Sequence, residues 1–205
     1  NGDDTLAKSL RRHGFTEKDI TDVFLTHLHF DHCGGSVKWK PGREGFELVF
    51  PNATYWSNEA HWNWAIKPNA REKASFLKEN ILPIQESGQL KFIGDGEELF
   101  PGFKVLCVNG HTEAMMLPII NYNGRTVAYC ADLIPSAAHV PLSYVMAYDM
   151  RPLITLEEKE IFLKEAADKN YILFYEHDLL IECSSLERTE RGVRVKDRLK
   201  LSDLG

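Results

Sequence analysis

The chain has 205 residues, of which 43% are apolar and 26% are charged; these are the proportions of a folded globular protein and exclude extensive disorder. Its 24 Lys and Arg residues against 30 Asp and Glu residues give a net charge of −6, which argues against nucleic acid as a partner. No apolar run approaches the roughly 20 residues that a membrane helix needs, and the first residues lack the pattern of a secretory signal.

The N-terminal half is predicted to mix short helices with short strands. Leu6 and Leu10 lie four residues apart before Gly14, which predicts a helix over residues 5–13. Apolar runs next to turn residues predict strands at residues 23–25, 47–50, 53–56 and 90–93. Two further helices, separated by Pro68, are predicted at residues 58–67 and 69–80.

The C-terminal half is predicted to be rich in strands. These are expected at residues 103–108, 115–120, 126–130 and 171–175, with a last hairpin over 181–195. The clearest helix is predicted at residues 155–170, where Thr155 and Glu158 have the spacing of a capping box. We therefore expect an α/β (α+β) fold in a single domain over 1–205, with a helical insertion at about 55–84.

The four cysteines and a C-terminal basic run bear on location and partners. The cysteines lie far apart with no CxxC pair, which indicates free thiols in a reducing compartment and favours a cytoplasmic protein: Cys33, Cys107, Cys130 and Cys183. Five basic residues fall between 188 and 198, and they fit either a solvated face or a local basic patch.

A cluster of potential metal ligands follows the predicted strand at 23–25. It consists of His27, His29, Asp31 and His32, four such groups within six residues. On an extended segment, side chains two apart share a face, and a turn after His29 can bring the other two to a common centre. Neutral imidazole and carboxylate are the ligands that borderline divalent ions prefer, so the cluster predicts a metal site.

Three more candidate ligands each follow a predicted strand of the C-terminal half: His111, Asp132 and His177. Side chains at the ends of successive strands converge on one edge of a sheet, which is a common place for binding sites. Taken alone, His111 or His177 would more often be a polar loop residue than a metal ligand. Together with the cluster at residues 27–32, they supply the additional ligands that a metal site needs.

The segment THLHFDHCGG, residues 26–35, resembles the signature of the metallo-β-lactamase superfamily of hydrolases. Gly110-His111-Thr112, Ala131-Asp132 and Glu176-His177-Asp178 match the later ligand motifs of that family in the same order. The resemblance spans residues 20–178. It implies a four-layered αβ/βα sandwich with two metal ions at the rim between its sheets.

The resemblance also implies a role for each ligand. His27, His29 and His111 would bind the first metal; Asp31, His32 and His177 would bind the second; Asp132 would bridge the two. An aspartate at position 132 is similar to lactonase, glyoxalase II and phosphodiesterase-like members, whereas the cysteine-bearing β-lactamases have a thiol there. Cys130 lies two residues earlier, where core packing is the expected role.

Family members usually begin with two strands and an Asp-Thr-Gly-like turn. This sequence starts at the helix that follows them, so we expect either a shortened variant or missing strands. If the strands are truly absent, one sheet has an uncovered edge, and a homodimer is then an expected alternative.

The function implied is a dinuclear metal-dependent hydrolase, in which a metal-bridging hydroxide attacks a small ester, lactone or thioester. Two divalent ions are expected, zinc first, with iron or manganese as alternatives. Asp31 would orient the hydroxide and accept its proton. His139 is a candidate proton donor. In lactonase-like relatives a tyrosine near the bridging aspartate helps to hold the substrate carbonyl. No tyrosine lies within several residues after Asp132 here, so Tyr144, or alternatively Tyr148, is the candidate for that role.

Two other functions remain alternatives at this point. One is a phosphodiesterase or nuclease-like hydrolase, which the acidic balance disfavours; the other is an iron-dependent redox member of the same superfamily. The expected partner is a small-molecule substrate, not nucleic acid or a membrane. The aromatic residues of 55–84 fit either a flap over the metals or a cover for the sheet, and His61 is expected to be structural.

Overall fold

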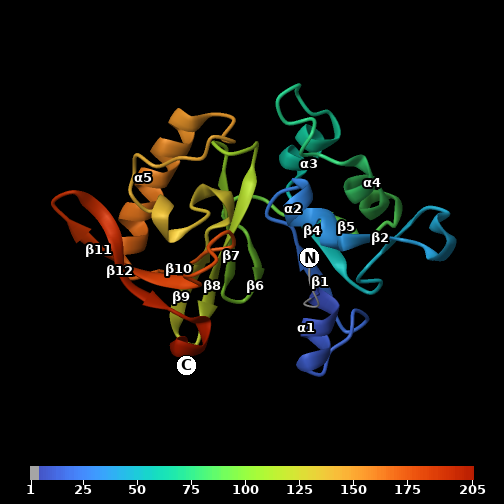
Figure 1. The fold of residues 1–205 in the computed structure, drawn as a ribbon, viewed down its shortest axis with the longest axis horizontal. Coiled ribbons are helices and arrows are strands. Elements are labelled where there is room, and N and C mark those ends of the chain that lie inside the picture. The colour runs from blue at the N-terminus through green and yellow to red at the C-terminus, as the bar shows by residue number, and fades with distance from the viewer. Residues whose placement is uncertain (1–4) are drawn as a thin grey trace. The chain divides into compact units, whose positions relative to one another are not determined.

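In the computed structural model, which describes residues 5–205, the chain divides into two compact units, Asn1–Phe92 and Ile93–Gly205 (Figure 1). Each unit has its own sheet and its own hydrophobic core, and each is described by itself. The single-domain organisation stays a prediction. No helix in the described part of the chain is long and apolar enough to cross a membrane.

The first unit is built on a small parallel sheet in the order β1-β4-β5, with a separate hairpin of β2 and β3. Its strands are β1 (Asp22–Phe24), β2 (Val37–Trp39), β3 (Phe46–Leu48), β4 (Thr54–Ser57) and β5 (Leu90–Phe92). Its helices are α1 (Leu6–Arg12), α2 (Phe30–Cys33), α3 (Glu59–Ile66) and α4 (Lys78–Glu86). The core includes Leu28, Tyr55, Trp62 and Ile81, so the residue between His27 and His29 is anchored in it.

Within the insertion, the helix predicted over 58–67 is confirmed as α3, whose N-cap residue Asn58 accepts hydrogen bonds from the backbone N–H groups of Ala60 and His61. The helix predicted over 69–80 is wrong, because α4 starts only at Lys78. The side chain of Asn69 accepts hydrogen bonds from the backbone N–H groups two and three residues on. That local turn competes with a helix.

The second unit is built on a seven-stranded sheet in the order β12-β11-β10-β9-β8-β7-β6. All neighbours are antiparallel except β9 and β10, which are parallel, and the helix α5 lies between these two in the sequence. The strands are β6 (Glu98–Phe100), β7 (Phe103–Val108), β8 (Met115–Tyr122), β9 (Arg125–Tyr129), β10 (Ile172–Phe174), β11 (Cys183–Thr189) and β12 (Gly192–Leu199). The predicted strands of this half are therefore confirmed, while β6 was missed.

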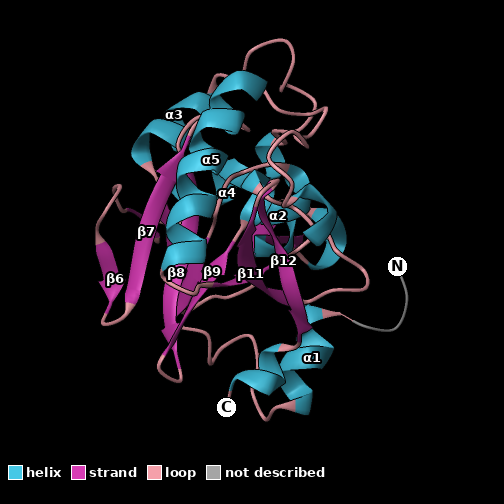
Figure 2. Ribbon diagram, turned by 90° about the vertical axis from the view of Figure 1, so that its left-hand side faces the viewer, coloured by secondary structure: helices cyan, strands magenta, loops and turns pink. Residues whose placement is uncertain are grey.

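Helix α5 (Pro152–Asp168) covers the sheet of the second unit, as Figure 2 shows. Its residues Phe162, Leu163 and Ala166 join one buried cluster with side chains from β7, β8, β9 and β10. The predicted capping box is wrong, because Pro152 starts the helix one turn earlier and Arg151 is the N-cap residue. Glu158 instead accepts hydrogen bonds from the backbone N–H groups of Asn109 and Gly110, which fixes the segment that leads to His111.

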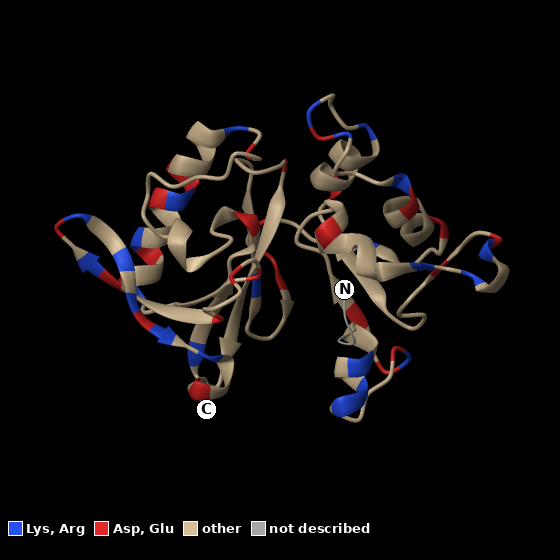
Figure 3. Cartoon of the chain, viewed as in Figure 1, with Lys and Arg blue, Asp and Glu red and all other residues tan. Residues whose placement is uncertain are grey.

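Charges of both signs alternate along the β11–β12 hairpin and α5 (Figure 3). Arg188, from the basic run, forms an ion pair of 2.7 Å with Asp168 of α5. Asp197 lies within the same run and bonds Ser185. The interleaving supports a solvated face over a basic patch. All four cysteines are free thiols in the described residues, as the sequence predicts.

Candidate metal centre

The first unit places its four predicted ligands around one short segment. The ring centroids of His27 and His29 lie 4.7 Å apart, and those of His27 and His32 lie 3.9 Å apart. His29 is the N-cap residue of α2, whose first turn carries Asp31 and His32. The extended backbone before that turn pairs the first two rings, and the turn then brings His32 back to them, as the sequence predicts.

The insertion supports this segment from within the unit. His61, which is 1% exposed, accepts a hydrogen bond of 2.8 Å from the backbone N–H of Leu28 through Nε2. The backbone carbonyl of Ser75 accepts one from Phe30, and the ring of Phe76 lies 4.8 Å from that of His29. The expected structural role of His61 agrees with these contacts. Tyr55, Trp62 and Phe76 are buried in the core of the first unit, which favours aromatic residues that cover the sheet over a flap above the metals.

A buried carboxylate of the insertion reaches one candidate ligand. Oε1 of Glu72 lies 3.5 Å from Nε2 of His29, while Oε2 accepts hydrogen bonds from Trp64 and Asn69 at 2.7 and 2.6 Å. Glu72 is only 3% exposed. A carboxylate on one ring nitrogen fixes the orientation of a ligating histidine and leaves the other nitrogen for a metal.

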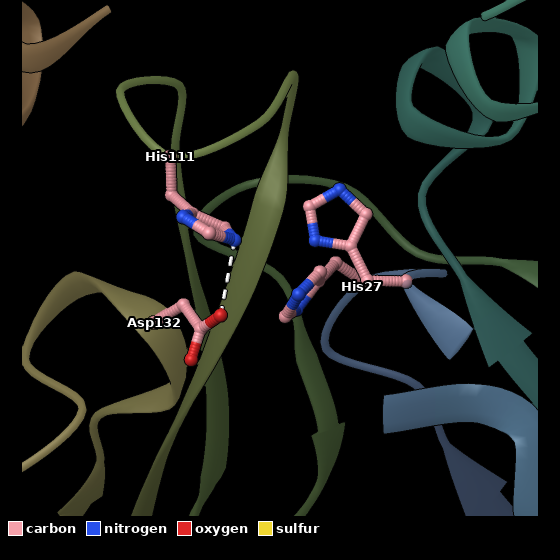
Figure 4. A group of neighbouring side chains, drawn as sticks. His27, His111 and Asp132 are labelled. Atoms are coloured by element: carbon pink, nitrogen blue, oxygen red, sulfur yellow. Dashed lines mark ion pairs between the residues drawn. The ribbon is translucent and has the colours of Figure 1, made fainter. Parts of the chain in front are cut away.

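The second unit joins its three predicted ligands through Asp132, which follows β9. Oδ2 of Asp132 lies 3.0 Å from Nε2 of His111, the contact drawn in Figure 4. Oδ1 lies 3.3 Å from Nε2 of His177. The two oxygens of one buried carboxylate thus face two different imidazoles, which is the arrangement that a bridging ligand requires.

The other nitrogen of His111 is held by a carboxylate that the sequence did not indicate. Nδ1 of His111 lies 3.0 Å from Oδ1 of Asp149, whose Oδ2 accepts a hydrogen bond from the backbone N–H of Met146. Burial alone would lower the pKa of His111, but hydrogen bonds and charges from Asp132 and Asp149 outweigh it and raise the pKa to about 9. The surroundings of this ring therefore favour positive charge, which is what a metal cation supplies.

The loop before α5 is tied down by a buried lysine. Lys159 of α5 donates hydrogen bonds from Nζ to the backbone carbonyls of Pro141, Leu142 and Tyr144, at 2.9, 3.3 and 2.7 Å. Burial lowers the pKa of Lys159 to about 8. This anchor holds the backbone that leads to Asp149.

Within each unit the donor atoms fit a divalent ion. One ligand atom each from His27 and His29 lies within 4.8 Å of the other, and the same holds for Asp132, Glu176 and His177. Imidazole nitrogens combined with carboxylate oxygens are ligands of zinc, iron and manganese. The second set includes Glu176, which belongs to the motif Glu176-His177-Asp178 but is not one of the predicted ligands.

The three predicted catalytic residues lie at partly exposed positions. Asp31 has a 45% exposed side chain, 3.4 Å from Nε2 of His32. Nδ1 of His139 lies 2.8 Å from Oγ of Ser136, and burial lowers the pKa of His139. Tyr144 is 59% exposed on the loop that Lys159 anchors. Their catalytic roles stay predictions.

Three residues beside the predicted ligands were missed by sequence reasoning: Glu72, Asp149 and Glu176. Glu176 had a signal, because it directly precedes His177. Asp149 and Glu72 follow no motif and lie 38 and 43 residues from the histidines that they contact. Only the folded chain reveals them.

We predict that Asp149→Asn weakens metal binding about 10- to 100-fold, because the carboxylate that orients His111 and increases its basicity is lost. Competition with a coloured chelator measures this affinity. Asp95→Asn serves as the control, since Asp95 bonds only the backbone N–H of Cys107 among the contacts described for it. Equal affinities in both variants would contradict the role of Asp149.

Comparisons with known proteins bear on the family. Residues 1–177 match the sequence model of a protein family that is described as "Metallo-beta-lactamase superfamily". N-acyl homoserine lactonases from Bacillus cereus and a Bacillus species are 29% and 30% identical over 110 residues, which is 54% of this chain and 36% of each relative. The matched region thus spans about a third of the length of these curated relatives.

Two solved structures resemble the chain over 98% of its length. A probable metal-dependent hydrolase from Staphylococcus aureus has a TM-score of 0.83 at 24% identity, with 71% of that chain covered. AidC, a dizinc quorum-quenching lactonase in complex with a product, has a TM-score of 0.78 at 26% identity, with 72% covered. These matches confirm the predicted fold class and the resemblance inferred from residues 26–35. The chain belongs to the metallo-beta-lactamase superfamily.

Proposed function

We propose that this chain is a metal-dependent hydrolase that works with two divalent ions shared through Asp132. His27, His29 and His111 would hold one ion, and Asp31, His32 and His177 the other. The observation that carries the proposal is the contact of each Asp132 oxygen with a different imidazole, at 3.0 and 3.3 Å. Zinc is the first choice, and iron and manganese suit the same ligand atoms.

The proposed substrate is a lactone, with small esters and thioesters as the wider class. Support comes from the N-acyl homoserine lactonases of Bacillus and from AidC, whose product complex contains N-hexnoyl-L-homoserine. The aspartate at position 132 agrees with a lactonase rather than with a cysteine-bearing β-lactamase.

When bound, divalent ions lower the pKa of a coordinated water from about 15.7 to about 7 and polarise an electrophilic oxygen. Asp31, with its half-exposed carboxylate, would orient the attacking water and accept its proton. His139 would return a proton to the leaving oxygen. Tyr144 would donate a hydrogen bond to the substrate from the loop held by Lys159.

We expect protein loaded with zinc to hydrolyse N-acyl homoserine lactones well above its rates on phosphodiesters and β-lactams. The reason is that the net charge of −6 gives no general basic excess for a phosphate backbone, and that Asp132 stands where the cysteine-bearing β-lactamases have a thiol. A panel of lactones, thioesters, phosphodiesters and β-lactams measures the preference, with metal-stripped protein as the control.

Two outcomes of the panel would overturn the proposal. Faster cleavage of phosphodiesters than of every lactone would assign the chain to the phosphodiesterase alternative. One tightly bound iron per chain, without hydrolysis of any substrate, would favour the redox alternative.

A further inference from the structure

We propose that Glu176 is an additional metal ligand on the His177 side of Asp132 and that Tyr129 holds it in place. The inference rests on the proposed two-ion function and extends it. It adds a carboxylate to the ligands that the sequence predicts for that side, and all the contacts that carry it lie within the second unit.

Distances between the donor atoms support a shared ion. Nε2 of His177 lies 3.3 Å from Oδ1 of Asp132 and 3.8 Å from Oε1 of Glu176. One ligand atom from each of the three residues lies within 4.8 Å of the others. Two ligands at about 2.1 Å from an ion, separated by a tetrahedral angle, are about 3.4 Å apart. The triangle of donor atoms therefore has the size that one ion requires.

The other oxygen of Glu176 is already engaged. The hydroxyl of Tyr129, at the end of β9, donates a hydrogen bond to Oε2 of Glu176. Its ring stacks on Phe174 of β10, with centroids 5.5 Å apart and ring planes at 20°. In this hydrogen bond the phenol hydroxyl is the donor and the carboxylate oxygen is the acceptor. This bond directs Oε1 towards His177.

Burial of the Glu176 carboxylate favours the binding of a cation beside it. The side chain of Glu176 is 12% exposed and that of Asp132 is 6% exposed. Two carboxylates removed from water beside each other repel, and a divalent ion between them compensates both charges. Each added carboxylate also shifts preference towards ions that favour oxygen ligands, such as Mn²⁺. We therefore expect the ion on this side to exchange for Mn²⁺ more readily than the ion on the His111 side.

The test compares four proteins: wild type, Glu176→Gln, Tyr129→Phe and Glu187→Gln. Glu187 is an exposed carboxylate of β11 and provides the matched control. Zn²⁺ and Mn²⁺ are titrated into metal-stripped protein against a coloured chelator, and bound metal is counted by elemental analysis. Circular dichroism checks that each variant is folded before titration.

We expect Glu176→Gln to bind one of its two ions at least about tenfold more weakly, with a larger loss for Mn²⁺ than for Zn²⁺. Tyr129→Phe should show a smaller loss of the same ion, because the carboxylate remains but is no longer held. Glu187→Gln should match wild type.

If folded Glu176→Gln binds both ions as tightly as wild type does, the role of Glu176 is overturned and the two-ion proposal stays intact. Fewer than two ions in wild type would instead overturn the proposed function.

Discussion

Replacing Asp132 with alanine should reduce bound metal from two ions to one or none and lower hydrolysis by at least about 100-fold. The side chain is 6% exposed, and its two oxygens face His111 and His177 at 3.0 and 3.3 Å. Elemental analysis and steady-state rates on the best lactone measure the two effects.

Two further variants separate loss of the bridge from loss of the fold. Asp132→Asn keeps the shape and one oxygen, so it should retain one ion more tightly than Asp132→Ala does. Asp168→Ala removes an exposed carboxylate of the same unit, whose ion pair with Arg188 lies in solvent and is therefore expected to contribute little to stability. It should keep both ions and wild-type rates. Wild-type metal content in folded Asp132→Ala would refute the bridging role.

The positions of the candidate ligands that lie near one another in sequence were predictable, because the local backbone decides their geometry. An extended segment followed by one turn suffices to bring His27, His29 and His32 together, and their ring separations of 4.7 and 3.9 Å follow from it. The later ligands were predictable in position, since each follows a strand. Their grouping around Asp132 depends on strand order, because β9 lies between β8 and β10 in the sheet.

The supporting residues were not predictable for a related reason. Asp149 reaches His111 only because the loop before α5 folds back, with the N–H of Met150 bonded to the carbonyl of His111. Glu72 reaches His29 because Asn69 starts a turn where helical periodicity predicts a helix. In both places a side-chain hydrogen bond or a tertiary contact outweighs local propensity, and neither leaves a regular pattern in the sequence.

At the start of α5, a capping motif in the sequence likewise fails to predict the partners of its residues. Thr155 and Glu158 have the spacing of a capping box, yet Thr155 donates its hydroxyl proton to the carbonyl of Arg151 inside the helix. Glu158 bonds the backbone N–H groups of Asn109 and Gly110 instead. The motif thus identified residues that matter at this end of the helix, but their partners lie on the segment that carries His111.

Replacing Gly110 with alanine should destabilise the second unit by about 3 kcal/mol or more, because there is no room for a side chain. A Cβ atom at this position would lie 2.2 Å from Oγ1, 2.4 Å from the backbone nitrogen and 2.5 Å from Cα of Thr155. Two of these are backbone atoms of α5, so a rotamer change cannot relieve the clash. Urea denaturation followed by circular dichroism measures the loss. Gly35→Ala is the control, since nothing lies within 4 Å of its Cβ position.

The same substitution should also weaken metal binding, which links the packing of α5 to the candidate metal centre. The carbonyl of Gly110 accepts a hydrogen bond of 2.8 Å from Arg151, and that of His111 accepts one of 3.1 Å from Met150, next to Asp149. Moving α5 away from Gly110 therefore separates His111 from the carboxylate that orients it. Chelator competition on the folded fraction should show a loss similar to that of Asp149→Asn. If Gly110→Ala is destabilised but binds metal as tightly as wild type does, the packing of α5 and metal binding are independent.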